Sequence, residues 1–319
     1  EIPSYRVDVT READVTEEVL RIYGYDNISI SSEMHSMLSH TDRPDREKVA
    51  ANMAELLSGN GFSEIMCNSL SPAAWYETTG DFDVKAIVRL ANPLSSDLNV
   101  MRISLLPGML NTISWNINRQ NSNLRLFELG NTYARKEGKG TLEITDNFSE
   151  TQILALSLTG NINEKRWNAP ELQSGFFHLK GYVETVLSRF GISRRDLTGT
   201  EVSHGWFAEG MKYNAGDIDL ASFGKVSRKY LSMFDIRQDV YYGEIIWENV
   251  IRLIKARTIR FSELPKYPWV RRDLALLLDK SVRFSQIREL AFKTERNILH
   301  EVDLFDLYES ESIGKDKKS

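Results

Sequence analysis

The sequence is poor in cysteine and has no long apolar run. Its single cysteine, Cys67, cannot form an internal disulfide bond, which fits a reducing compartment. No apolar stretch is long enough to cross a bilayer and no signal peptide is present, so we expect a cytoplasmic protein without membrane contact. The chain starts with Glu1-Ile2-Pro3 and not with methionine, and we therefore expect an internal piece of a longer protein.

Positive charge is also scarce. The 40 Lys and Arg residues are outnumbered by 45 Asp and Glu residues, which gives a net charge of -5. No overall electrostatic field would draw such a chain onto nucleic acid. Any RNA contact is therefore expected to be local or shared with a partner.

Motifs of familiar catalytic and metal centres are missing. The sequence contains no phosphate-binding loop and no nucleophile-elbow pattern. Five histidines are scattered without cysteine or carboxylate partners at zinc-ligand spacing: His35, His40, His178, His204 and His300. We expect surface or core roles for them, and we assign no catalytic and no cofactor-binding residue.

Helices and strands alternate along the middle of the chain. Apolar residues at helical spacing predict helices at 45–58, 105–118 and 176–191. Strand-like runs occur at 62–70, 84–90, 124–134, 152–160, 218–226 and 241–247. Interleaved helices and hairpins predict an α+β fold with a mixed, mainly antiparallel sheet flanked by helices.

An acidic stretch near the start combines a short strand with a short helix that Gly24 ends. Asp14 at the N-cap and Glu17 three residues later fit a capping box, in which each side chain accepts a hydrogen bond from a backbone N–H. Acids in the first turn also suit the helix dipole, which explains Glu18. Asp8 lies on the preceding strand and is not explained by capping, so a metal site stays open beside the cap.

The sequence changes character from Phe261 onward. Pro265 and Pro268 mark a boundary, after which a strand, a helix and a second strand are predicted. These elements fall at 274–278, 286–293 and 302–308. Three elements of this size cannot bury their sheet alone, so we expect a truncated domain. The pair Arg271 and Arg272 fits either an RNA phosphate contact or a salt-bridged strand start.

Long ordered strings carry a family resemblance over nearly the whole chain. The sequence resembles the C-terminal part of the bacterial phenylalanyl-tRNA synthetase beta chain. The end of that family's B5 domain is similar to IPSYRVDVTREADVTEEVLRIYGYDNI. Its class II synthetase-like core is similar to GFSEIMCNSL, NPLSSDLNVMRISLLPGMLNTISWNINRQ and LRLFELGNTYAR, and the opening of its ferredoxin-like anticodon-binding domain to PKYPWVRRDLALLLD. The resemblance implies a partial B5 domain at 1–37, a catalytically inactive class II core at 38–258 and a partial ferredoxin-like domain at 259–319.

The resemblance also implies a magnesium site. In the family, one acid on the strand and three acids six, nine and ten residues later are magnesium ligands at the boundary with the alpha chain. These positions are Asp8, Asp14, Glu17 and Glu18. Carboxylate oxygens suit this hard cation, which usually keeps several waters. Each carboxylate has enough lone pairs to cap a helix and to bind metal.

The resemblance further implies that catalysis belongs to another chain. Active class II enzymes hold ATP with an arginine of motif 2 and with a glycine-rich strand and helix ending in arginine, motif 3. Arg125 and Glu128 echo motif 2, but an edge charge and a strand end explain them equally well. No glycine cluster follows 241–247. The helix at 45–58 falls at motif 1, an interface element, so we expect some of its apolar residues to be exposed.

The leading hypothesis is a fragment of the beta subunit of phenylalanine-tRNA ligase. It would scaffold the catalytic alpha chain, which uses ATP and Mg²⁺ to attach phenylalanine to tRNA(Phe), in a tetramer of two alpha and two beta chains. Two alternatives are a paralogous class II-like enzyme and a stand-alone tRNA-binding protein. The missing motif 3 argues against the first, and the acidic first helix argues against the second.

Overall fold

The computed structural model describes residues 2–33, 36, 44–136, 144–202, 205–257, 261, 263, 266–310, 313, 314 and 316–319. The contacts divide the chain into two units, Glu1–Thr258 and Ile259–Ser319. The helices of the described part are all too short or too polar to span a membrane. The boundaries expected at 37/38 and 258/259 lie outside the described residues and stay predictions.

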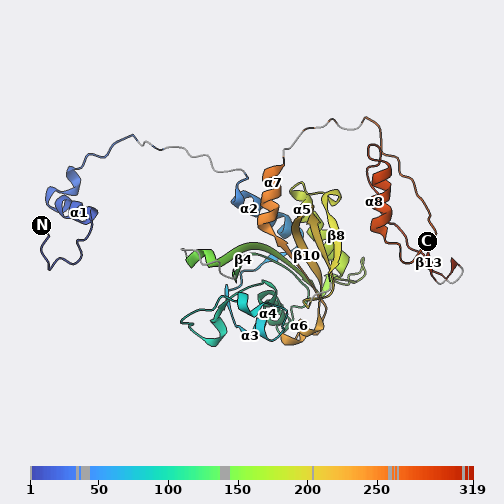
Figure 1. Ribbon diagram of the computed structural model, residues 1–319, viewed down its shortest axis with the longest axis horizontal. Helices are drawn as coiled ribbons and strands as arrows, with labels where there is room; N and C mark the ends of the chain where they lie inside the picture. Colours follow the sequence, from blue (N-terminus) through green and yellow to red (C-terminus); the bar gives the residue numbers. More distant parts are fainter. Residues whose placement is uncertain are drawn as a thin grey trace. The chain divides into compact units, whose positions relative to one another are not determined.

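A seven-stranded sheet forms the centre of the first unit, in the order β1-β4-β5-β11-β10-β9-β8 (Figure 1). Its strands are β1 (Ser63–Glu64), β4 (Leu124–Arg135), β5 (Phe148–Thr159), β8 (Thr198–Val202), β9 (Phe207–Ala215), β10 (Ile218–Val226) and β11 (Val240–Ile246). Strand β1 runs parallel to β4, and the other neighbours are antiparallel. The predicted α+β fold with a mixed, mainly antiparallel sheet is confirmed.

Three helices cover one face of this sheet: α2 (Arg46–Gly59), α5 (Phe176–Arg189) and α7 (Trp247–Ala256) (Figure 1). The carboxylate of Asp45 caps α2 by accepting hydrogen bonds from two backbone N–H groups, at 3.1 and 3.3 Å. Val49, Met53 and Leu57 are buried, as their helical spacing predicts. These side chains join those of α5 and α7 in one apolar cluster.

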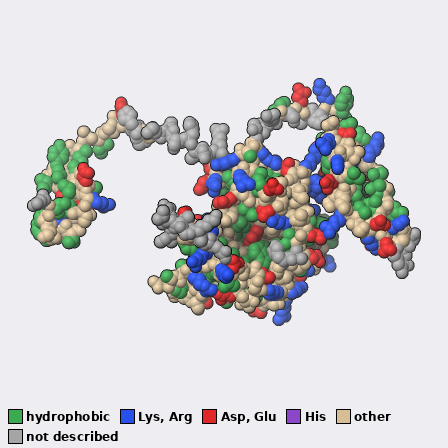
Figure 2. All heavy atoms as spheres, in the orientation of Figure 1, with side chains coloured by type: hydrophobic (Ala, Val, Ile, Leu, Met, Phe, Trp, Pro, Cys, Tyr) green, Lys and Arg blue, Asp and Glu red, His purple; other side chains and the backbone are tan. Residues whose placement is uncertain are grey.

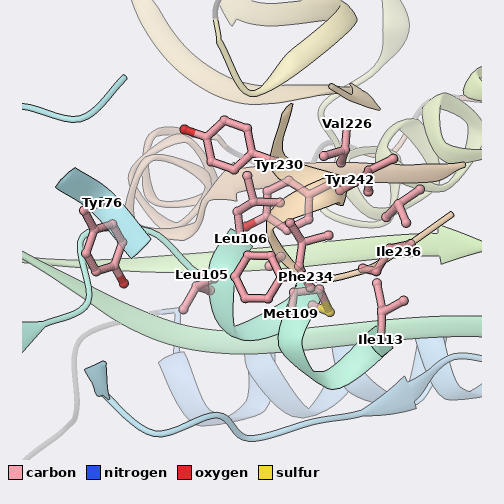
Figure 3. Close-up of a cluster of buried hydrophobic side chains, with 14 of the residues drawn as sticks. Tyr76, Leu105, Leu106, Met109, Ile113, Val226, Tyr230, Phe234, Ile236 and Tyr242 are labelled. Atoms are coloured by element: carbon pink, nitrogen blue, oxygen red, sulfur yellow. The ribbon is translucent and has the colours of Figure 1, made fainter. Parts of the chain in front are cut away.

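The opposite face is covered by α3 (Ala74–Glu77), α4 (Leu106–Ile117) and α6 (Arg228–Met233). Successive strand residues point to opposite faces, so β5 sends Leu154 to the first cluster and Ala155 to the second. Figure 3 shows the second cluster, where Leu106 and Met109 from α4 lie beside Tyr242 from β11. Both faces of the sheet are therefore filled with packed side chains.

Two short strand pairs complete this unit. Strands β2 (Leu70–Ser71) and β3 (Val100–Met101) pair with each other. Strands β6 (Asn161–Asn163) and β7 (Leu172–Gln173) form a hairpin directly after β5.

The N-terminal helix α1 (Glu12–Tyr23) has no buried residue. It ends at Gly24 as expected, because this glycine adopts a φ of +88° and its N–H donates to Leu20 O at 2.8 Å. The predicted N-cap was wrong. The cap position is Arg11, and Asp14 lies at N3, where its carboxylate accepts a hydrogen bond from the Arg11 N–H.

The second unit contains β12 (Leu278–Asp279), α8 (Phe284–Thr294) and β13 (Lys317–Lys318). The helix predicted at 286–293 is present, but the strand predicted at 274–278 is reduced to its last residue. The strand predicted at 302–308 is absent from the described residues. Tyr308 instead exchanges backbone hydrogen bonds with Ser319. No described residue of this unit is buried, and apolar side chains gather on its surface (Figure 2).

Three other predicted strands differ from the structure. The short strand predicted around Asp8 is absent, because residues 4–5 and 7–8 form turns and the Arg6 N–H donates to Pro3 O at 3.0 Å. Residues 84–90 begin with a 3₁₀ turn at Val84–Ala86 because the Asp83 carboxylate accepts the Lys85 N–H at 2.9 Å. The run at 62–70 contributes only β1 and the first residue of β2. Between them, the N–H of Cys67 donates to the Glu128 carboxylate at 3.2 Å and not to a neighbouring strand.

Candidate functional site

The acidic stretch places Asp8 and Glu18 on either side of one arginine. Arg6 Nη2 lies 2.9 Å from Asp8 Oδ2 and 2.6 Å from Glu18 Oε1, and Arg21 also contacts Glu18. Hydrogen bonds from Arg6 lower the pKa of both carboxyls. These two acids, ten residues apart in the sequence, therefore share a cation that the chain itself supplies.

Asp14 and Glu17 lie differently. Asp14 Oδ2 accepts hydrogen bonds from the backbone N–H groups of Thr10 and Arg11, at 3.0 and 2.8 Å, and these bonds lower its pKa. Glu17 is exposed. The Asp14 carboxylate thus caps the start of α1, but it does so from position N3 and not from the N-cap.

The four predicted ligands fit magnesium only in part. Asp8 and Glu18 offer the hard oxygen atoms that magnesium prefers, but these atoms converge on the Arg6 guanidinium. Within the described ranges, no three His, Cys, Asp or Glu side chains gather closely enough to hold a metal. A magnesium ion at this position would need Arg6 to move.

The two residues that echo motif 2 are both engaged inside the protein. Arg125 donates to the backbone oxygens of Asn60 and Ile162, at 2.9 and 2.6 Å. Glu128 is buried on β4 and pairs with Arg102, Nη1 to Oε1, at 2.6 Å. Arg102 also donates to the backbone oxygens of Cys67 and Asn131. These contacts tie β4 to the segments on either side of it.

A second buried carboxyl lies on β11. Glu244 Oε1 accepts hydrogen bonds from Ser104 Oγ at 2.9 Å and from the Tyr242 hydroxyl at 2.6 Å. Burial raises the pKa of Glu244 despite these donors, and it raises that of Tyr242 as well. The Ser104 hydroxyl also accepts the N–H of Leu106 at 3.1 Å, so this network fixes the start of α4.

Cys67 lies beside these polar groups. Its Sγ is 3.5 Å from Thr112 Oγ1, and burial together with the Glu128 charge raises its pKa to about 11. A thiol with such a pKa is not a nucleophile at neutral pH, because the reactive form is the thiolate. Its partial burial agrees with a role as a small apolar residue.

The polar interior was not found from the sequence. Arg102 and Glu244 each stand singly within apolar strings, at 100–106 and 240–247. A single charged residue in a segment predicted to be buried indicates a polar interior, because a buried charge needs a partner. This was the signal that the sequence offered. A cavity of about 10 Å³ adjoins Arg102 and Ser104, room for about one water molecule.

A larger cleft of about 690 Å³ lies at the edge of the sheet. It is bounded by β1, the start of β4 and the β6–β7 hairpin, and its lining is rich in asparagine. The residues are Gly61, Ser63, Asn121, Asn123, Leu124, Arg125, Leu126, Asn161, Ile162, Asn163, Glu164, Arg166, Asn168 and Ala169. Sequence reasoning missed this site because its asparagines are spread over three segments.

The remaining residues considered as RNA contacts or metal ligands lie on the surface or outside the residues that the structure describes. Arg271 and Arg272 are exposed, and Arg271 Nε lies 3.5 Å from Asp273. The His300 ring packs against Trp269, with centroids 3.6 Å apart. His35, His40 and His204 lie outside the described residues.

Three family models match successive parts of the chain. Residues 1–25 match the tRNA synthetase B5 domain, residues 30–247 the phenylalanyl-tRNA synthetase beta chain CLM domain, and residues 265–319 the ferredoxin-fold anticodon binding domain. The second match alone covers more than half of the chain.

Curated relatives and solved structures agree with these models. A phenylalanine–tRNA ligase beta subunit from Bacteroides thetaiotaomicron is 41% identical over 321 residues, which cover 100% of this chain and 39% of that protein. One from Porphyromonas gingivalis is 38% identical over 323 residues, with the same coverage. The chain thus spans about two fifths of the length of these relatives.

The fold is similar to that of a class II synthetase. Two structures of a pyrrolysyl-tRNA synthetase from Desulfitobacterium hafniense align with TM-scores of 0.50 and 0.51, at 20% and 19% identity. Each alignment covers 67% of this chain, and the two alignments cover 70% and 71% of the respective synthetase chains. This likeness concerns the fold alone.

Proposed function

We propose, because this chain belongs to the phenylalanyl-tRNA synthetase beta chain family, that it is a non-catalytic part of a phenylalanine-tRNA ligase. It would scaffold a separate alpha chain that activates phenylalanine with ATP and transfers it to tRNA(Phe). The observation that carries this proposal is the packing on the sheet. A synthetase needs an open face for its substrates, whereas here apolar clusters fill both faces of the sheet. Figure 3 shows the cluster on the face covered by α3, α4 and α6.

The state of the motif positions supports the same proposal. Arg125 and Glu128 are hydrogen-bonded to groups of the protein itself, Arg125 to two backbone oxygens and Glu128 to Arg102, so neither is arranged to hold ATP as a motif 2 residue would. The helix that follows β11 is α7, where motif 3 is expected. It starts with the buried Trp247 and continues with Val250 and Ile251 in the core. No glycine-rich platform for adenine precedes it in the sequence.

An alpha chain is the proposed partner, in a tetramer of two alpha and two beta chains. The expectation that α2 exposes apolar residues for this contact is met only by Ala51. Its large apolar side chains are buried or half-buried, and its exposed positions are short or polar, as at Ala51, Asn52, Glu55 and Ser58. A contact at α2 would therefore use close approach of small side chains and hydrogen bonds.

The match of residues 265–319 to an anticodon-binding domain supports tRNA(Phe) as a second partner in the assembled enzyme. The three parts at 1–37, 38–258 and 259–319 remain the proposed domains. A cytoplasmic location is proposed because protein synthesis takes place there.

Magnesium is proposed at Asp8, Asp14, Glu17 and Glu18 in the assembled enzyme only. When bound, this cation would supply positive charge that ties the acidic stretch to carboxylates or waters of the partner. In the isolated chain, Arg6 supplies that charge to Asp8 and Glu18. Support for the metal comes from the family resemblance and from the oxygen donors present.

Co-elution with a matching alpha chain tests the scaffold proposal. The chain and the alpha subunit, mixed and passed over a size-exclusion column, should elute together earlier than either alone. A variant with Glu55→Arg on the exposed side of α2 should weaken co-elution, whereas Glu209→Arg on β9 should leave it unchanged. Separate elution of the unaltered chains at tens of micromolar would contradict the proposal.

A further inference from the structure

We propose that the asparagine-rich cleft beside the β6–β7 hairpin binds a short unpaired segment of RNA. Its volume of about 690 Å³ falls in the range that holds small organic ligands such as a nucleotide. The cleft lies on the class II-like core, outside the part that matches the anticodon-binding domain. It is therefore an RNA contact additional to the proposed function and independent of catalysis by another chain.

The shape of the cleft is fixed by the hairpin's attachment to the sheet. Gly160 adopts a φ of +71°, and a Cβ at this position would collide with the backbone oxygen of Ser122. Asn123 Oδ1 accepts the N–H of Asn161 at 2.8 Å, and its Nδ2 donates to Glu164 at 3.1 Å. These contacts hold the hairpin against the start of β4, so the site is formed before a ligand arrives.

Hydrogen-bonding groups of the lining are left over for a ligand. Among the residues that the structure describes, none pairs with the side chains of Asn163, Asn168 or Arg166, all of which line the cleft. An asparagine amide offers a donor and an acceptor side by side, which matches the edge of a nucleobase. A guanidinium can pair with a phosphate or stack on a base.

An exposed tryptophan, Trp167, stands in the sequence between Arg166 and Asn168, which line the cleft, and its own ring adjoins the lining without being part of it. The Trp167 side chain is 99% exposed, so it contributes almost nothing to the packing of the fold. Unpaired RNA bases are commonly bound by stacking on aromatic rings, and such stacking tolerates any base. Lys165 and Arg166 precede this ring in the sequence and supply positive charge that suits a phosphate backbone, and Arg166 belongs to the lining of the cleft.

A protein partner fits the cleft less well. The centres of protein interfaces are apolar, whereas this lining consists mainly of amide and charged groups. The charge here is also modest, since Glu164 and Glu171 lie beside Lys165 and Arg166. The affinity for RNA should therefore depend more on base stacking than on the release of counterions. We expect it to fall only slowly with salt concentration, as for a protein that contacts about two phosphates.

Fluorescence anisotropy of a labelled oligoadenylate, titrated with the full chain, tests this site. We expect saturable binding that Trp167→Ala weakens roughly tenfold, the size of one lost stacking contact. The matched control is Trp115→Ala, which removes a 55%-exposed tryptophan on α4 and should leave the affinity unchanged. Adenosine monophosphate in excess should compete weakly, because it fills the cleft without the flanking phosphates.

Photocrosslinking locates the contact independently of affinity. An oligonucleotide carrying one 4-thiouridine should crosslink to the peptide that contains Trp167, and Asn163→Ala with Asn168→Ala should reduce the yield. The proposal is overturned if the unaltered chain does not bind the oligonucleotide or if both tryptophan variants bind equally well. It is also overturned if Trp167→Ala abolishes co-elution with the alpha chain while RNA affinity is unchanged, which would make the surface a protein interface.

Discussion

Arg102 and Glu128 form an ion pair inside the protein, with Nη1 and Oε1 2.6 Å apart and side chains 8% and 2% exposed. The pair joins the segment before α4 to strand β4, the second strand of the large sheet. Gly130, on the same strand, leaves room for it, because a Cβ there would collide with the Arg102 guanidinium. A residue that resembles part of an ATP site is thus used to hold the core together.

Removal of one partner of this pair should be costly. Arg102→Met leaves the Glu128 carboxylate buried without its cation, and we expect the free energy of unfolding to fall by about 3–5 kcal/mol. The double variant Arg102→Met with Glu128→Leu should recover most of this loss, since no charge is then buried alone. Urea denaturation of the variants measures both effects. Equal losses in the single and double variants would show that packing, and not charge, matters at this position.

Glu244 should make stability depend on pH. Burial raises its pKa above the ordinary value of 4.5, so the folded chain holds this proton more tightly than the unfolded chain. Its contribution is complete below pH 4.5 and is lost as the pH rises through the folded pKa, by up to about 1.4 kcal/mol per pH unit. Glu244→Gln should flatten the profile of unfolding free energy in this range. An unchanged profile would mean that the carboxyl is ionised in the folded protein.

Arg6 should compete with magnesium for the acidic stretch. Arg6→Ala frees the carboxylates of Asp8 and Glu18, so the chain should bind Mg²⁺ more tightly than before. Arg21→Ala also removes one positive charge, but Arg21 contacts only Glu18. The gain in Mg²⁺ affinity should therefore be smaller for this variant. Chemical-shift changes of α1 amide groups during a Mg²⁺ titration report the affinities. If neither variant binds Mg²⁺ and the complex with the alpha chain is indifferent to it, capping and ion pairing are the only roles of these acids.

The second unit should exchange its amide hydrogens quickly. Its strands β12 and β13 are two residues long, and none of its described residues is buried. Amides at Leu278 and Asp279 should therefore exchange much faster than those of β5, which lies between two strands of the large sheet. If the amides of β12 were as well protected as those of β5, residues 259–319 would fold stably without further elements.

The pattern of apolar residues in the sequence predicted those helices and strands whose apolar side chains pack into the core. The helix at 45–58 was recognised from Val49, Met53 and Leu57, and the strand at 152–160 from its continuous apolar run, and both are present. Strands β8 and β9 were missed because their sequences, at 198–202 and 207–215, mix glycine with polar residues and are ordered by pairing with each other.

Contacts between distant segments could not be predicted in the same way. The N-cap of α1 was misplaced because Asp14 could serve at either the N-cap or N3, and only the backbone conformation of Arg11 decides between them. The ion pair of Arg102 with Glu128 joins residues 26 positions apart, and the cleft gathers asparagines from three segments. Neither has a local pattern.

The most direct test of the central proposal is phenylalanine-dependent exchange of pyrophosphate into ATP. We expect the purified chain to give no exchange above background, and a mixture with the alpha chain to give a strong signal. Arg125→Ala should not reduce the rate of exchange by the mixture, because this side chain donates to the backbone oxygens of Asn60 and Ile162 and is not proposed to hold ATP. Exchange by the chain alone, lost on Arg125→Ala or Glu128→Gln, would contradict the proposal that this chain is non-catalytic.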